Sequence, residues 1–121
     1  YYIVIDELIA LIASANKTAS DTLKQQLETI AVIGRSSNVS LILIAQDWNV
    51  ASSGISTTLR NQISVKVALG RPSKSSLQYL FPDIDSIIVP AGPGTGVISS
   101  NSAMDGRAYP ILAPTVEKAV R

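Results

Sequence analysis

The sequence of 121 residues contains no cysteine and no histidine. The lack of cysteine excludes disulfides and thiolate metal sites within this chain, and the lack of histidine excludes imidazole ligands. A cysteine or histidine nucleophile and a histidine general base are excluded for the same reason. Acid–base or metal chemistry on this chain must therefore depend on its aspartate and glutamate residues, which number nine.

The chain is also poor in net charge and in long apolar runs. Ten Lys and Arg residues against nine Asp and Glu residues give a formal net charge of +1, so the broad basic surface of a typical nucleic-acid-binding domain is absent. Any contact with DNA must therefore be local. No uninterrupted apolar run approaches the roughly 20 residues that are needed to cross a bilayer. With 46% hydrophobic residues, the chain should still fold as one domain or as part of one.

The first half of the sequence predicts a strand, two helices and a second strand. The run Tyr1–Ile5 is β-prone throughout, as in a parallel-sheet strand that is buried on both faces. Residues Leu8–Ala15 predict the start of a helix, and Thr18 with Asp21 resembles a capping box before an amphipathic helix. Val39–Ala45 is typical of another fully buried strand. This order of elements predicts a right-handed crossover and a parallel sheet.

The second half predicts shorter elements that are separated by turns. In chain order these are a helix at Thr57–Asn61, a strand at Ile63–Leu69, a helix at Ser73–Leu80, a hairpin that joins Ile87–Val89 to Val97–Ser99 through the glycine-rich turn Ala91–Gly96, and a last strand within Arg107–Leu112.

The pair Asp6-Glu7 follows an apolar strand directly, which is the Walker B pattern of P-loop ATPases. A rigid strand delivers two carboxylates at its C-terminal end, where ligands bind in open α/β sheets. In such a site Asp6 would hold the Mg²⁺ shell and Glu7 would polarise the attacking water. The alternative is that the two acids only interact with the positive end of the following helix dipole.

The elements after this pair resemble, in their order and spacing, the motor domain of FtsK/SpoIIIE DNA translocases. Residues Ile30–Gln46 are similar to the family segment in which a helix ending in Arg leads into a strand ending in Gln. Leu59–Val67 is similar to the next family strand, which follows a basic turn. Ala91–Ile98 looks like the glycine-rich turn before the closing strands. The resemblance covers nearly the whole chain.

This resemblance implies an α/β fold, namely the part of a three-layer RecA-like parallel sheet from the Walker B strand onward, with a C-terminal β-hairpin. Residues 1–121 would form the C-terminal half of a motor domain. The implied activity is ATP hydrolysis with Mg²⁺ that drives double-stranded DNA through a ring, in chromosome partition or conjugative transfer. The ring would be a homohexamer in the cytoplasm, and any membrane anchor would lie outside this chain.

The resemblance also implies roles for individual residues. Gln46 would sense the γ-phosphate from its strand tip. Apart from the resemblance, Arg60 and Arg71 lie near strand ends, from which an arginine could act catalytically on the nucleotide of a neighbouring subunit; the alternative is that each is a solvated surface residue. Three residues in or after the break behind the Walker B strand would contact DNA phosphates in the central pore: Asn16, Lys17 and Lys24.

The sequence departs from the family pattern in two ways. Family members commonly have Arg-Pro after the sensor Gln, whereas Asp47-Trp48 follows Gln46 here. The chain also has no Gly-x-x-x-x-Gly-Lys-Ser/Thr motif, so it cannot cradle a triphosphate by itself. We therefore expect an upstream half that carries the P-loop, with its strand between the strand of Gln46 and the strand of Ile63. This fragment alone should be inactive.

The sequence is also compatible with two other functions. The chain could be a catalytically silent module for subunit contact or DNA docking. It could also be an unrelated α/β nucleotide-binding domain in which the acidic pair only caps a helix.

Overall fold

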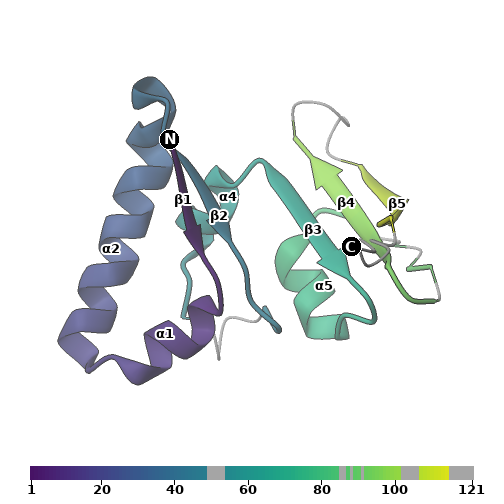
Figure 1. Cartoon of the computed structure of the whole chain (residues 1–121), viewed down its shortest axis with the longest axis horizontal. Coiled ribbons are helices and arrows are strands. Elements are labelled where there is room, and N and C mark those ends of the chain that lie inside the picture. The colour runs from purple at the N-terminus through teal and green to yellow at the C-terminus, as the bar shows by residue number, and fades with distance from the viewer. Residues whose placement is uncertain (49–53, 85–86, 88, 91, 102–106, 115–121) are drawn as a thin grey trace, which may run out of the picture. The chain divides into compact units, whose positions relative to one another are not determined.

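The computed structural model describes residues 1–48, 54–84, 87, 89–90, 92–101 and 107–114 (Figure 1). The chain divides into two compact units, Tyr1–Ile63 and Ser64–Arg121. The first contains a parallel pair of strands, and the second contains an antiparallel sheet of three strands. The predicted α/β class is therefore confirmed.

The first unit consists of two parallel strands that are joined by helices. Its elements in chain order are β1 (Tyr2–Ile5), α1 (Leu8–Ser14), α2 (Lys17–Ile33), the 3₁₀ helix η1 (Gly34–Ser37), β2 (Ser40–Leu43) and α4 (Thr57–Gln62). The register places Ile3 opposite Leu41 and Ile5 opposite Leu43. The predicted strand–helix–strand crossover and the short helix before residue 63 are confirmed, and Figure 1 shows α2 running alongside both strands.

The helix α2 begins earlier than the predicted capping box. Asn16 is its N-cap, and the Asn16 side chain accepts a hydrogen bond from the backbone N–H of Ala19 at 2.9 Å. Thr18 lies inside the first turn, where its carbonyl accepts a bond from the Thr22 hydroxyl. The prediction of a cap at Thr18 is wrong, because asparagine is at least as good a cap as threonine and Asn16 is reached first. The helix ends before Gly34, as expected.

The two strands are not buried on both faces. Side chains alternate between the faces of a sheet. Along β2, Leu41 and Leu43 are half-buried, whereas Ile42 is 43% exposed. Across the register Val4 is 57% exposed on the same face as Ile42. The prediction of fully buried strands is wrong for this chain because α2, which packs against β2, can cover only one face.

The core of the first unit is formed by apolar residues of the helices and of the segment before α4. Leu8 and Leu59 are almost completely buried, with 0% and 1% of their surface exposed. The other core residues are Ile12, Leu27 and Ile55. α2 therefore packs against α1 on one side and against α4 on another.

The second unit is an antiparallel sheet in the order β3–β4–β5 with one helix beside it. Its elements are β3 (Val65–Leu69), α5 (Lys74–Leu80), β4 (Thr95–Ser100) and β5 (Ala108–Leu112). Ser73 caps α5 by accepting a hydrogen bond from the N–H of Ser76. The predicted third strand, second short helix and last strand are confirmed.

The C-terminal hairpin is formed by β4 and β5, and its partner strand differs from the predicted one. Ile87 and Val89 lie outside any strand, and β4 pairs with β3 on one side and β5 on the other. Gly96 explains part of this pairing, because a Cβ at this position would lie 2.4 Å from the carbonyl oxygen of Ala68 on β3. Close backbone approach to β3, which local patterns do not show, therefore selects the partner.

Within the residues described, no helix is both long and apolar enough to span a membrane.

Candidate active site at the strand ends

Asp6 and Glu7 follow directly after β1, and both side chains are exposed. The Asp6 carboxylate accepts a hydrogen bond from the backbone N–H of Glu7 through Oδ1 at 3.0 Å. The strand therefore delivers two carboxylates at its C-terminal end, as the Walker B pattern predicts. Oxygen ligands of this kind suit Mg²⁺. In the part of the chain that the structure describes, no group of three or more acidic side chains forms a complete metal cage.

The backbone of Glu7 is held in the left-handed region, with φ at 55°. This conformation costs a residue other than glycine about 1–2 kcal/mol. It persists because neighbouring groups are fixed: the N–H of Leu8, which is completely buried, donates to the carbonyl of Ile44 at 3.0 Å, and the Glu7 carbonyl accepts from Leu11 at 3.1 Å. Such strain clusters at functional sites.

Gln46 lies beside Glu7, although 39 residues separate them in sequence. Its Nε2 donates a hydrogen bond to Oε1 of Glu7 at 3.0 Å. An ionised carboxylate can only accept, so the nitrogen of the amide must face it. The strand ends bring the two together, because the N–H of Ile44 donates to the carbonyl of Ile5 at 2.9 Å and extends the parallel ladder by one residue.

The contact between Glu7 and Gln46 shows that the Glu7 side chain is not a hydrogen-bonding cap of α1, but it does not test an interaction of the acidic pair with the helix dipole, which needs no hydrogen bond. Glu7 occupies the N-cap position of α1, yet its side chain makes no capping hydrogen bond there. An acid that served only as a helix cap would bond the first N–H groups of the helix. The Glu7 carboxylate instead binds a side chain from the next strand. This arrangement can position water or a phosphate oxygen at the sheet edge.

The two predicted arginines lie in different units and in different settings. Arg60 is half-buried in α4, where its Nε and Nη2 each lie 3.4 Å from Oδ1 of Asn61. The basic turn expected before the third strand is therefore helical. Arg71 is exposed, two residues after the end of β3. Their predicted action on a neighbouring nucleotide stays a prediction.

The three predicted DNA-binding residues all belong to the start or the body of α2. The amide oxygen of Asn16 is the helix cap, and Lys17 is the exposed first residue of the helix. Lys24 is half-buried two turns further on. Its ammonium lies so close to Gly54 that a Cβ built there would be 2.7 Å away. Asn16 and Lys17 are therefore exposed at the start of α2, whereas Lys24 is half-buried, and contact of these residues with DNA stays a prediction.

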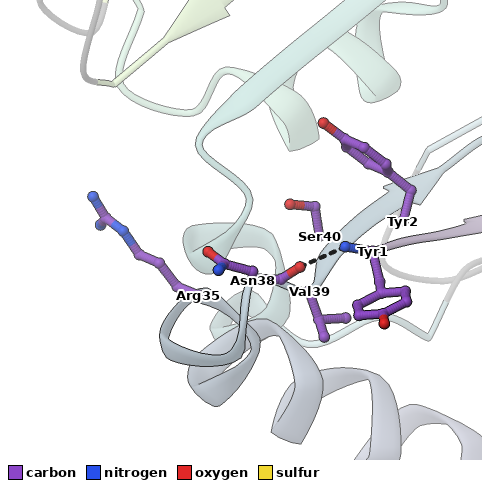
Figure 2. Close-up of a pocket in the computed structure, with 6 residues that line it drawn as sticks. All are labelled: Tyr1, Tyr2, Arg35, Asn38, Val39 and Ser40. Carbon is purple, nitrogen blue, oxygen red and sulfur yellow. Dashed lines mark hydrogen bonds between the residues drawn. The ribbon is translucent and has the colours of Figure 1, made fainter.

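An open pocket of about 360 Å³ lies at the opposite end of the two strands. Figure 2 shows the residues that line it: Tyr1, Tyr2, Arg35, Asn38, Val39 and Ser40. The amino group of Tyr1 donates to the Asn38 carbonyl at 2.7 Å, and the Arg35 side chain extends away from both tyrosines. β1 and β2 begin here, whereas Glu7 and Gln46 follow their opposite ends, so the pocket is separate from the acidic site.

Sequence reasoning did not single out Glu28 and Ser56, although the structure joins them. The Ser56 hydroxyl donates a hydrogen bond to Oε1 of Glu28 on α2. A local signal existed for Ser56, because a serine three residues before an apolar helical position is a typical N-cap. No local signal existed for Glu28, whose partner is 28 residues away.

Comparison with known proteins supports the fold. No family model matches the sequence, and no curated protein does. A solved structure, the cytoplasmic domain of the Thermomonospora curvata type VII secretion ATPase EccC, aligns with 98% of this chain at a TM-score of 0.68 and 21% identity. The chain has the fold of part of an ATPase. It spans 13% of the length of that protein, so the similarity concerns one portion of a much larger molecule.

Proposed function

We propose that this chain is the Walker B half of a motor ATPase of the FtsK/SpoIIIE kind. The observation that carries the proposal is the hydrogen bond between Gln46 and Glu7 at the ends of two parallel strands. Asp6 holds Mg²⁺, Glu7 polarises the attacking water, and Gln46 senses the terminal phosphate. The structural similarity to a secretion ATPase supports the same class of protein.

Gln46 has the donors for two simultaneous contacts. A primary amide carries two N–H donors, and in the described structure one binds Glu7. The other can donate to a phosphate oxygen of bound ATP. A contact to both groups would let the presence of the phosphate set the orientation of the Glu7 carboxylate. ATP would supply the reacting phosphoryl group and Mg²⁺ would neutralise its charge, while these residues position the water.

The exposed apolar face of the β1–β2 sheet favours a further segment of the same protein that covers it. Tyr2, Val4, Ile42 and Ile44 are between 43% and 76% exposed, and together they form a contiguous apolar surface. We assign this surface to the P-loop half, which the chain lacks and which a complete ATP site requires. Val4→Asp should then impair assembly of the nucleotide site in the complete protein, whereas Tyr109→Asp in the second unit should not.

Two observations bear on the cargo of the motor, and they favour different cargoes. The resemblance to FtsK/SpoIIIE proteins favours double-stranded DNA, with Lys17 as a phosphate contact and a homohexameric ring as the assembly. A second candidate is a motor for protein secretion, because the similar structure belongs to a type VII secretion ATPase and the net charge of this chain is only +1.

Hydrolysis of ATP by the complete protein tests the proposal. Glu7→Gln should slow turnover about 100-fold or more but keep Mg-dependent ATP binding. The matched control Asp21→Asn, which changes an exposed acid on α2, should keep both. Unchanged turnover in Glu7→Gln would reject the catalytic role of Glu7 and favour a silent docking module or an unrelated nucleotide-binding domain. Stimulation by duplex DNA that declines steeply with salt separates the DNA motor from the secretion motor.

A further inference from the structure

Helix α2 contacts the segment before α4 through two side chains on one stripe. Lys24 and Glu28 are four residues apart and therefore lie on the same side of the helix. The Lys24 ammonium lies against Gly54, whose φ of 55° turns the chain there. Glu28 Oε1 accepts the hydrogen bond from the Ser56 hydroxyl, two residues later. The hydrogen bond to Glu28 anchors Ser56, the residue that precedes α4.

Ser56 links this contact to Arg60 through the backbone. The Ser56 hydroxyl oxygen accepts a hydrogen bond from the N–H of Leu59 at 3.1 Å, which makes Ser56 the N-cap of α4. The Ser56 carbonyl accepts the N–H of Arg60 at 3.1 Å. The Glu28 carboxylate on α2 therefore holds the side chain of Ser56, and the backbone carbonyl of the same serine accepts the hydrogen bond from the Arg60 N–H.

The surrounding packing makes this link stiff. Leu27, which precedes Glu28, is 3% exposed, Ile55 is 4% exposed and Leu59 is 1% exposed. α2 packs against α4, and Leu27 and Leu59 are buried residues of these two helices, while Ile55 is buried in the segment before α4. In a close-packed core a shift of one helix displaces the other. The start of α2 carries Lys17, so the same helix connects a candidate phosphate contact to Arg60.

We propose that Glu28 is a positioning residue, which acts through Ser56 to place Arg60 for the stabilisation of charge on the nucleotide of a neighbouring subunit. The proposal rests on the proposed motor function and makes Arg60, rather than Arg71, the arginine that acts between subunits. It also assigns Lys24 to the support of α4 instead of DNA contact. A small displacement of such a group lowers the rate without preventing nucleotide binding.

The first test compares three substitutions in the complete protein. Glu28→Ala should lower the kcat for ATP on the order of 100-fold and leave KM nearly unchanged. Glu28→Gln keeps an amide oxygen that can accept from Ser56 and should restore most of the rate. The control Asp21→Ala, which removes an exposed acid from the same helix, should have no effect. Equal losses in Glu28→Ala and Glu28→Gln would contradict the hydrogen-bond mechanism.

A double substitution shows whether Glu28 acts through Arg60. Arg60→Ala should lower kcat at least as much as Glu28→Ala, and the double variant should be no slower than Arg60→Ala alone. Additive losses would mean that Glu28 acts elsewhere, and full activity in Arg60→Ala would remove Arg60 from the reaction. Either result overturns the proposal.

Mixed rings test action between subunits. Glu7→Gln subunits are inactive but carry a correctly placed Arg60, whereas Glu28→Ala subunits carry an intact Glu7. An equal mixture should regain about a quarter of the wild-type rate per subunit, because half of the subunits keep Glu7 and half of their neighbours supply the arginine. A mixture no faster than the average of its separate components would place the defect of Glu28→Ala within its own subunit and overturn the proposal.

Amide hydrogen exchange separates failure of this proposal from failure of the motor function. Glu28→Ala should increase exchange of the Leu59 and Arg60 amides in the complete protein, and Asp21→Ala should not. Unchanged exchange overturns the link from Glu28 to Arg60 whether or not the protein hydrolyses ATP. If exchange of these amides increases but the complete protein has no ATPase activity, the structural link from Glu28 to Arg60 is supported. The positioning role in catalysis and the proposed motor function are then both rejected.

Discussion

The side-chain amide of Gln46 donates a hydrogen bond of 3.0 Å to the carboxylate of Glu7. The two residues follow neighbouring parallel strands, and the backbone bonds of Ile44 to Ile5 and of Leu8 to Ile44 hold those strand ends together. Glu7 is thereby connected to the second strand through its side chain and through its neighbour in sequence. The direction of the Glu7 carboxylate is therefore fixed by the protein itself, as the proposed catalytic role requires.

The bond between Gln46 and Glu7 should appear as a coupling energy. We expect the stability losses of Gln46→Ala and Glu7→Ala to be non-additive by about 0.5–1 kcal/mol, because each variant removes the same exposed hydrogen bond. Urea unfolding of the two single variants and the double variant measures this term. The pair Gln46→Ala and Asp21→Ala, which share no contact, should be additive. Additivity in both pairs would contradict the bond.

Asp6 and Glu7 should differ in the step that they support. Asp6→Ala should weaken Mg-dependent ATP binding, since it removes a hard oxygen ligand. Glu7→Gln should keep binding and slow hydrolysis about 100-fold or more, because positioning and charge stabilisation dominate phosphoryl transfer. Equilibrium binding and single-turnover hydrolysis distinguish the two. An equal loss of binding in both variants would reject the assigned roles.

The strained backbone of Glu7 predicts an unusual gain from glycine. In urea unfolding, Glu7→Gly should have a free energy of unfolding about 1 kcal/mol higher than that of Glu7→Ala, because glycine adopts a φ of 55° without strain. Gly70→Ala provides the reverse control: its φ is 74° and nothing lies within 4 Å, so only strain is added. A Glu7→Gly variant less stable than Glu7→Ala would show that the left-handed turn is not retained.

Gly96 should tolerate alanine much less well than Gly70. A Cβ at Gly96 would lie 2.4 Å from the Ala68 carbonyl oxygen and 3.1 Å from Leu69 Cα, both of which are backbone atoms of β3. Relief of this collision must separate β3 from β4, so Gly96→Ala should destabilise the second unit by about 3 kcal/mol or more. Thermal unfolding and exchange of the β3 amides measure the effect. Similar losses for both glycine variants would argue against the close approach.

Lys17 is the residue on which the DNA-motor hypothesis makes its clearest prediction. Lys17→Ala should reduce DNA-stimulated ATP hydrolysis and leave basal hydrolysis largely intact. It should also lower the slope of log affinity against log salt by about one unit, equally for unrelated duplexes, because one phosphate contact is lost. Lys74→Ala, the first residue of α5, is a matched control. An unchanged slope would mean that Lys17 makes no phosphate contact and is only a solvated surface residue.

Local patterns were sufficient for most of the secondary structure. The apolar run before Asp6, the amphipathic spacing that ends before Gly34 and the serine before α5 each act within a few residues, so they are visible in the sequence. The placement of two acids at a strand end also follows from local order. The cap of α2 was misplaced by two residues because Asn16 and Thr18 are both acceptable caps, and only the geometry of the turn selects between them.

The sequence by itself determined most of the elements, though not the strand expected at Ile87–Val89, and it determined that two carboxylates stand at the end of β1. The tertiary structure alone decided that the amide nitrogen of Gln46 faces the carboxylate of Glu7, that Glu7 adopts a left-handed turn, that Glu28 binds Ser56, and that β4 pairs with β3. These contacts join residues far apart in the chain or depend on packing around a single turn. Their geometry is set by strand register and buried side chains, which no short sequence window contains.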